Sequence, residues 1–180
     1  MYMKDFFDSI PDLSDDTISL RRITPGDAQL LGEFIRDDSI YRYLPTFLFE
    51  RKFDDPVTVI ERMYTQGCEE GSLLLGVYPR AYGRFAGIVE IYGYKESMHK
   101  VCIGYRLSPQ MWGKGYATRA AGLLSDYLLE NTHIEIITAS SMVENGASAR
   151  VLEKCGFTTV TAALEDWGFS EPVKAYKWFK

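Results

Sequence analysis

Cysteine, histidine and long apolar runs are all scarce in this chain. Its 180 residues include 3 cysteines and 2 histidines, which are widely spread and contain no CxxC pair. Zinc sites need clustered ligands and disulfide-stapled domains need many cysteines, so we expect no metal site and free thiols in a reducing cytoplasm. No apolar stretch approaches the roughly 20 residues that span a bilayer. Residues 1–16 lack the basic start and apolar core of a signal peptide, so no membrane or secretory role is expected.

Basic charge is also in deficit. The chain has 20 Lys and Arg against 25 Asp and Glu, so its net charge is 20 − 25 = −5. This balance argues against a nucleic-acid partner. The apolar fraction of 46% and the length are typical of one folded soluble domain. We therefore expect a single domain over residues 1–180, with 1–16 as an N-terminal extension, acting as a monomer or homodimer. Aromatic residues, in contrast, are plentiful at 14%.

The order of the predicted elements indicates an α/β (α+β) domain with a mixed, mostly antiparallel central sheet flanked by helices. Residues 18–23 alternate apolar and polar side chains and predict a first strand. Thr24 and Pro25 predict a helix start, and Asp55 begins a second helix that Gly67 can end. Further strands are expected at residues 73–78, 84–92, 100–107, 134–139, 157–164 and 173–179, with helices at 115–130 and 148–154. The short turns favour antiparallel neighbours, and the late strand–helix–strand unit adds a parallel pair.

The stretch from Ser108 to Thr118 links a predicted strand to a predicted helix and contains two glycines. Gly113 and Gly115 lack Cβ atoms, so a ligand can approach the backbone closely. The free N–H groups of the following helix and its dipole suit a phosphate or pyrophosphate. A P-loop would need glycine at position 108, and a dinucleotide fingerprint would need glycine or alanine at 118, so both patterns fail. Gln110 and the two glycines fill the pattern Q/R-x-x-G-x-G/A, and a plain helix-entry loop is the alternative.

Two further segments join this stretch in a family resemblance. Residues 103–109 read IGYRLSP, residues 112–118 read WGKGYAT and residues 145–157 read NGASARVLEKCGF. In this order they resemble the Gcn5-related N-acetyltransferase (GNAT) superfamily, nearest to its RimJ/RimL-like branch. The predicted element order agrees with the acyl-CoA N-acyltransferase (GNAT) fold. The resemblance implies a cytoplasmic enzyme that transfers acetyl from acetyl-CoA directly to a primary amine, either a peptide N-terminus or a small cationic amine.

The resemblance also implies which residues bind the donor. The loop at residues 110–115 would hold the CoA pyrophosphate through backbone N–H groups. The strands at 101–107 and 134–139 would splay apart, and the first would pair with the pantetheine arm as an added strand. Asn145 would contact the arm, and Arg150 the phosphate end. The expected cofactor-binding residues are Arg106, Leu107, Gln110, Trp112, Gly113, Lys114, Gly115, Tyr116, Ala117, Thr118, Asn145 and Arg150.

Acetyl transfer requires a neutral amine, a polarised thioester and a proton for the departing thiolate. Glu90 is the candidate base, because alternation places it with Ile88 and Tyr92 on one strand face. If that face is covered, burial would raise the pKa of the carboxyl into a useful range. A solvated glutamate is the alternative reading, and Glu165 or Asp166 are weaker candidates for the base.

Ser148 is the candidate acid or thiolate stabiliser, because the resemblance implies a hydroxyl near the sulfur. The alternative is a serine that caps the helix after Gly146. Tyr105 and Tyr116 are nearby phenols that could equally be packing residues. The aromatic loop at residues 41–49 either walls the acceptor pocket or packs as an ordinary connection. An enzyme is the leading hypothesis, with a non-catalytic acyl-CoA-binding sensor as the alternative; a protein that binds ATP or NAD is opposed by the two failed glycine patterns.

Overall fold

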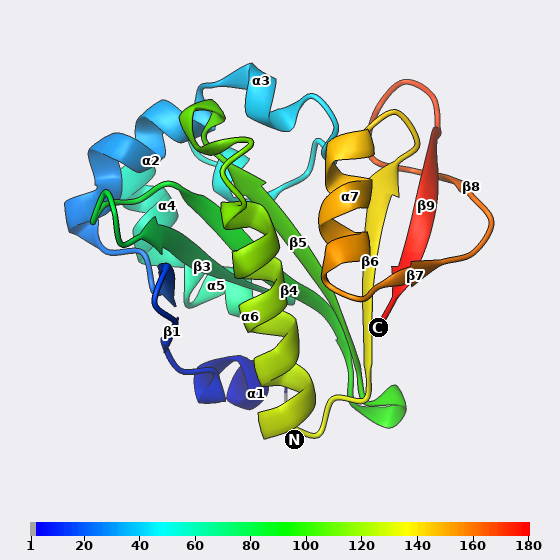
Figure 1. Cartoon of the computed structure of the whole chain (residues 1–180). Coiled ribbons are helices and arrows are strands. Elements are labelled where there is room, and N and C mark those ends of the chain that lie inside the picture. The colour runs from blue at the N-terminus through cyan, green and yellow to red at the C-terminus, as the bar shows by residue number, and fades with distance from the viewer. Residues whose placement is uncertain (1–2) are drawn as a thin grey trace.

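A computed structural model describes residues 3–180 and consists of one twisted sheet with helices on both faces (Figure 1). The nine strands follow the order β1-β2-β3-β4-β5-β6-β9-β7, and β8 also pairs with β9. Their bounds are β1 Leu13–Ser14, β2 Ile18–Arg21, β3 Ser72–Pro79, β4 Gly87–Lys95, β5 Lys100–Leu107, β6 Ile136–Met142, β7 Thr158–Thr159, β8 Ala163–Glu165 and β9 Val173–Phe179. Every pairing is antiparallel except that of β5 with β6. The predicted mixed, mostly antiparallel sheet is therefore confirmed.

Two helical layers cover the sheet, and the alternation of β3 shows how. The α-helices are α1 Met3–Ser9, α2 Ala28–Ile35, α3 Asp38–Tyr41, α4 Pro56–Met63, α5 Gln66–Glu69, α6 Tyr116–Asn131 and α7 Gly146–Lys154, and the 3-10 turns are η1 Pro25–Asp27, η2 Phe49–Arg51, η3 Glu96–Met98 and η4 Pro109–Met111. Leu73 and Leu75 pack with α1 and α6 in one core, whereas Leu74 packs with α2 and α4 in a second core. Successive strand residues point to opposite faces, so one apolar run serves both cores. In Figure 1, α6 crosses the near face of the strands and α7 lies alongside β6.

The parallel pair β5–β6 opens partway along its length. Its register joins Lys100 to Ile136, Val101 to Ile137 and Cys102 to Thr138, and the pairing ends there. β5 nevertheless continues to Leu107 and β6 to Met142. The two strands therefore separate and leave a gap in the middle of the sheet, as the splay predicted from the resemblance requires.

Within the segment expected as an N-terminal extension, α1 packs on the core through Phe6 and Phe7, which are fully buried. Two local expectations differ from the structure. The second helix does not continue to Gly67: α4 ends at Met63, and Gly67 lies within α5. A Cβ at Gly67 would lie 3.5 Å from the ring of Phe49, so this glycine permits close packing. The strand expected at residues 157–164 is two short strands, β7 and β8.

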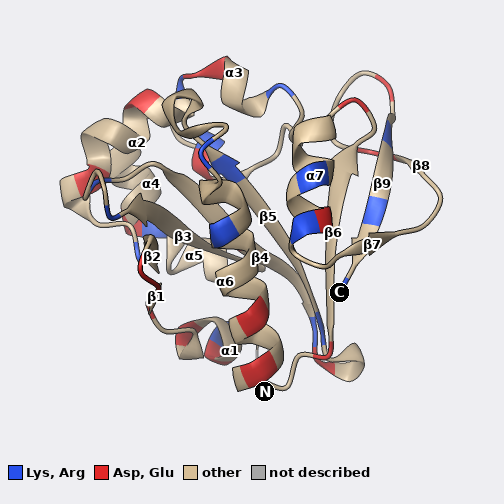
Figure 2. Ribbon diagram, in the orientation of Figure 1, with Lys and Arg blue, Asp and Glu red and all other residues tan. Residues whose placement is uncertain are grey.

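Charged residues are sparse on the central strands (Figure 2). β3 has none, and β4 has Glu90 as its single buried one. On β5, Arg106 is the buried charge. Burial of a charge is costly unless it is paired, so these two residues require partners. Across residues 3–180, no helix has the length and apolarity needed to cross a membrane.

Candidate active site

A cleft of about 1100 Å³ occupies the gap between β5 and β6. Residues from both sheet faces line it, because the gap is open through the sheet. The sequence-predicted residues that line it are Glu90, Arg106, Leu107, Trp112, Gly113, Gly115, Tyr116, Ala117, Thr118, Asn145, Ser148 and Arg150. Gln110 and Lys114 are not among the lining residues. The fold thus gathers one predicted loop, one helix start and one buried strand face around a single space.

The turn before α6 has the geometry of an anion cradle. Gly113 has φ +71° and Gly115 has φ +81°, both in the left-handed region, and nothing lies within 4 Å of a Cβ built on either. The first hydrogen bond of α6 runs from the Arg119 N–H to the Gly115 carbonyl, at 3.0 Å. The N–H groups of Tyr116 and Ala117 therefore precede the hydrogen-bonded helix and are available to a ligand. Open space, free donors and a 16-residue helix dipole together suit a phosphate group.

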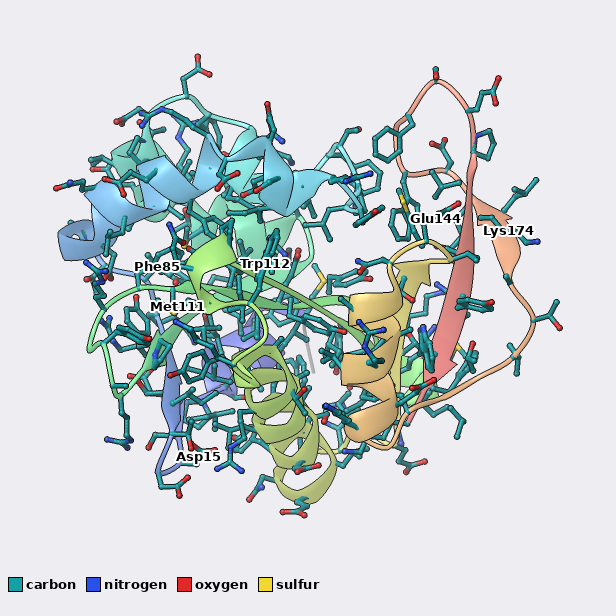
Figure 3. All side chains as sticks on the ribbon, turned by 45° about the horizontal axis from the view of Figure 1, so that its top comes forward. Asp15, Phe85, Met111, Trp112, Glu144 and Lys174 are labelled. Atoms are coloured by element: carbon teal, nitrogen blue, oxygen red, sulfur yellow. The ribbon has the colours of Figure 1, made fainter. Side chains whose placement is uncertain are left out.

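Trp112 holds this turn against the end of β5. Its Nε1 donates to the Leu107 carbonyl at 2.7 Å, although the side chain is 52% exposed. Trp112 and the buried Met111 lie in the turn that leads into α6 (Figure 3). The Nζ of Lys114 lies instead 2.9 Å from the Tyr82 hydroxyl, away from the cleft lining. A binding role for Lys114 stays a prediction.

The start of α7 places a hydroxyl pair at the cleft. The Asn145 side chain accepts the Ser148 N–H at 3.1 Å, so the helix cap is Asn145, and the alternative of Ser148 as the cap is wrong. The Tyr105 hydroxyl lies 3.0 Å from the Ser148 carbonyl oxygen and 2.9 Å from its Oγ. Burial raises the pKa of Tyr105, so its phenol stays protonated at neutral pH. Arg150 lies one helical turn beyond Gly146 and lines the cleft.

A buried ion-pair cluster lies on the opposite sheet face. Arg106 Nε and Nη2 donate to the two oxygens of Glu50 at 2.6 and 2.7 Å, and its Nη1 donates to Glu90 Oε2 at 2.8 Å. The side chains of Arg106 and Glu90 are 3% and 9% exposed. The alternative interpretation of Glu90 as a solvated glutamate is therefore wrong. Ser72 donates to the other oxygen of Glu90. The Arg106 guanidinium is hydrogen-bonded to both carboxylates, so the predicted contact of Arg106 with CoA would have to use its backbone groups.

Glu50 is the residue that sequence reasoning missed. It is fully buried in η2, directly after the aromatic stretch at residues 41–49 that was expected to wall the acceptor pocket. Tyr43, Leu44 and Phe47 from that stretch do line the cleft. In the sequence, Glu50 is a single acidic residue between Phe49 and Arg51, and no hydrophobic periodicity indicates that it is buried.

Glu165 and Asp166 also border the cleft, on the far side of the gap. Glu165 pairs with Lys177 at 3.2 Å and accepts the Trp167 Nε1 at 2.9 Å. Asp166 is exposed and accepts the Gly168 N–H at 2.9 Å. Lys177 also lines the cleft and offsets the charge of Glu165, so Asp166 is the carboxylate that adds negative charge here. Among residues 3–180, no group of three or more His, Cys, Asp or Glu side chains is placed to hold a metal ion.

Comparison with known proteins agrees with this geometry. The uncharacterized N-acetyltransferase YoaA of Bacillus subtilis is 24% identical over 147 residues, covering 82% of each chain. The structure of the microcin C7 self-immunity acetyltransferase MccE, in complex with acetyl-CoA and AMP, has a TM-score of 0.78 at 22% identity, covering 92% of this chain and 93% of that one. RimL, a ribosomal L7/L12 alpha-N-protein acetyltransferase in complex with coenzyme A, has a TM-score of 0.77 at 14% identity, covering 94% and 97%. A family described as the acetyltransferase (GNAT) domain matches residues 17–158. The chain therefore belongs to the GNAT family and is an acetyltransferase.

Proposed function

We propose that this enzyme transfers the acetyl group of acetyl-CoA directly to a primary amine, and that it acts as a RimJ/RimL-like N-acetyltransferase. The observation that carries the proposal is the cleft open through the sheet. It joins a phosphate-type turn and a hydroxyl pair on one face to a buried carboxylate on the other. A donor and an acceptor can thus approach one reaction centre from opposite faces, which suits direct transfer.

The donor side binds CoA mainly through backbone groups. The turn containing Gly113 and Gly115 takes the pyrophosphate on its N–H groups, and Arg150 meets the phosphates. Beyond Cys102, β5 has no pairing with β6. That edge can pair with the amides of the pantetheine arm as an added strand would.

The reaction requires one proton acceptor and one proton donor. The amine nitrogen attacks the thioester carbon, a C–N bond forms and the C–S bond breaks. Glu90 takes the amine proton, directly or through a water, because its carboxylate has lone pairs beyond those used by Arg106 and Ser72. Ser148, held by the protonated Tyr105, donates a hydrogen bond to the departing thiolate, and solvent supplies the proton that the thiolate takes up. The acetyl group passes from sulfur to nitrogen without an acyl-enzyme.

The acceptor is a peptide N-terminus or a small cationic amine. The net charge of the chain, −5, favours a cationic acceptor, and the exposed carboxylate of Asp166 lines the cleft. RimL, which shares the fold, is named for acting on a protein N-terminus. The acceptor therefore presents a primary amine on a flexible or extended group that can reach the gap.

Thiol release from acetyl-CoA across a panel of peptides, polyamines and aminoglycosides tests this function. Release with at least one amine supports it. Tight acetyl-CoA binding with no release across the panel would instead favour a non-catalytic sensor. A ligand at 100 times its Kd stabilises the fold by about 2.7 kcal/mol, so a thermal-shift series with acetyl-CoA, ATP and NAD reports binding separately.

Glu90→Gln tests the proposed base. We expect kcat to fall strongly while acetyl-CoA affinity stays near the wild-type value, because Glu90 lies on the acceptor face. Gln keeps the hydrogen-bonding shape but not the basic carboxylate. Turnover equal to the wild type at every pH would exclude Glu90 as the base.

A further inference from the structure

The Glu50–Arg106–Glu90 cluster contains two carboxylates and one guanidinium. All three side chains are nearly inaccessible, with exposed fractions of 0%, 3% and 9%. Arg106 is shared between the two acids, so the cluster has one more negative than positive charge. A pair of Arg106 and Glu90 alone would have been neutral and would already satisfy both charges.

The two acids hold different positions relative to the cleft. Glu90 lines it, together with Arg106, whereas Glu50 is fully buried behind them and is not among the lining residues. Glu50 binds Arg106 through two parallel hydrogen bonds, which fixes the plane of the guanidinium. The remaining Nη1 then points at Glu90 Oε2. Glu90 is therefore the carboxylate of the cluster that faces the cleft.

We propose that Glu50 is a positioning residue, which neutralises and orients Arg106 so that Glu90 keeps its basicity toward the acceptor amine. This inference rests on the proposed function. An unopposed guanidinium at 2.8 Å would stabilise the charged form of Glu90 and weaken it as a base. With Glu50 present, the guanidinium is shared with a second carboxylate. The same arrangement leaves Glu90 fixed in direction, because Ser72 holds its other oxygen.

The other groups around Glu90 do not replace Glu50 in this role. Ser72 on β3 is neutral, and burial raises the pKa of Tyr92 on β4, so that phenol is neutral too. Tyr41 of α3 donates to Glu50 at 3.2 Å, and burial likewise raises its pKa. Glu165 acts on the neighbourhood of Tyr92 but is paired with Lys177. Arg106 and Glu50 are thus the buried charges in the hydrogen-bonded network of Glu90.

Glu50→Gln is the decisive variant. It leaves a neutral, still hydrogen-bonded Arg106–Glu90 pair, so no uncompensated charge is buried and the fold is expected to persist. We expect the acid limb of the pH profile of kcat/KM to move to lower pH by about one unit. The 13C signal of the Glu90 carboxyl, assigned by comparison with Glu90→Gln, should titrate at a correspondingly lower pH. At neutral pH kcat should fall about tenfold while the KM for acetyl-CoA stays unchanged.

Asp38→Asn is the matched control. Asp38 belongs to the same part of the chain and pairs with Arg51 at 3.2 Å, but its side chain is 88% exposed. Its removal takes away one carboxylate and one ion pair without touching the cluster. We expect both the pH profile and the Glu90 titration to match the wild type.

A folded Glu50→Gln enzyme whose Glu90 signal and acid limb match the wild type would overturn the inference, whatever its turnover. If Glu50→Gln does not fold, Glu50→Asp replaces it, because the shortened carboxylate opposes Arg106 less. It should move both measurements in the same direction by a smaller amount, and an unmoved Glu90 signal would again overturn the inference. The NMR titration needs no turnover. A wild type without acetyl transfer therefore contradicts the proposed function, while the Glu90 comparison still tests the role of Glu50.

Discussion

Alanine substitutions at Gly113 and at Gly83 together distinguish the effect of backbone strain from a role of the Gly113 turn in binding. Gly113 has φ +71°, where an L side chain costs about 1–2 kcal/mol. Gly83, in the turn between β3 and β4, has φ +62° and the same open space around an added Cβ. Because a 180-residue domain loses about 2–4 °C of Tm per kcal/mol, both alanine variants should melt about 2–8 °C lower.

Only the Gly113 variant should also weaken acetyl-CoA binding. Its Cβ would enter the space through which a phosphate reaches the N–H groups of the turn, whereas Gly83 lies outside the cleft lining. Loss of one hydrogen bond to a charged group costs about 1.5–3 kcal/mol, which corresponds to about a tenfold to hundredfold weaker Kd. Titration calorimetry with acetyl-CoA measures the Kd of each folded variant, and calorimetric melting measures the Tm.

The comparison of the two variants decides the interpretation. Equal drops in Tm with a higher Kd in Gly113→Ala alone would place the phosphate at this turn. A Gly113→Ala protein that melts like Gly83→Ala and binds acetyl-CoA as tightly as the wild type would refute the cradle. A higher Kd in both variants would show that strain acts through the whole fold.

Three further substitutions test the remaining parts of the site and the fold. Ser148→Ala should lower kcat about tenfold or more and leave the KM for acetyl-CoA unchanged, because the hydroxyl is proposed to act as the thiolate departs. Steady-state thiol release measures both constants, and an unchanged kcat would exclude Ser148 from the reaction. Arg106→Gln should lower the free energy of unfolding by about 3–5 kcal/mol, because the substitution leaves two buried carboxylates without their cation. Urea denaturation measures this free energy, and a loss below about 1 kcal/mol would contradict the prediction. Burial opposes ionisation of Asp15, but hydrogen bonds from the Ile18 and Thr17 amides outweigh it and lower the pKa of Asp15. A lowered pKa stabilises the fold above the unfolded-state pKa, and this stability is lost as the pH falls through the folded-state pKa. Asp15→Asn should therefore cost about 1 kcal/mol at pH 7 and progressively less in acid; melts at several pH values that show a constant difference would contradict this.

The parts of the fold that could be predicted are those that local sequence patterns determine. Alternation identified β2, short apolar runs between turn residues identified β3, β4 and β5, and the spacing of Gly113 and Gly115 identified the turn before α6. These signals lie within about ten residues and depend on backbone preferences alone. The gap between β5 and β6 came from the family resemblance, since no local pattern encodes where two strands part.

The side-chain partnerships could not be predicted in the same way. Arg106 lies 56 residues from Glu50, and Tyr105 lies 43 residues from Ser148. Only the folded chain brings these pairs together, and a single acidic residue beside an aromatic stretch gives no sign that it is buried. The Asn145 cap was different, because an Asn followed three residues later by a polar residue at a helix start is a readable signal. The sequence analysis instead considered Ser148 as the cap, as the alternative to its proposed role in catalysis.

The alternation of β5 explains why both halves of the proposed chemistry meet in one gap. Tyr105 packs with the α6 core and reaches Ser148, while the next residue, Arg106, lies opposite Ile88 on the other face and holds Glu90. Successive strand residues necessarily point to opposite faces. Two neighbouring residues on one strand therefore hold the proposed thiolate-stabilising hydroxyl on the donor side and the proposed base on the acceptor side. The register of β5 against β4 fixes the separation of the two groups, so a slip of one residue would exchange both faces at once and remove both functions together.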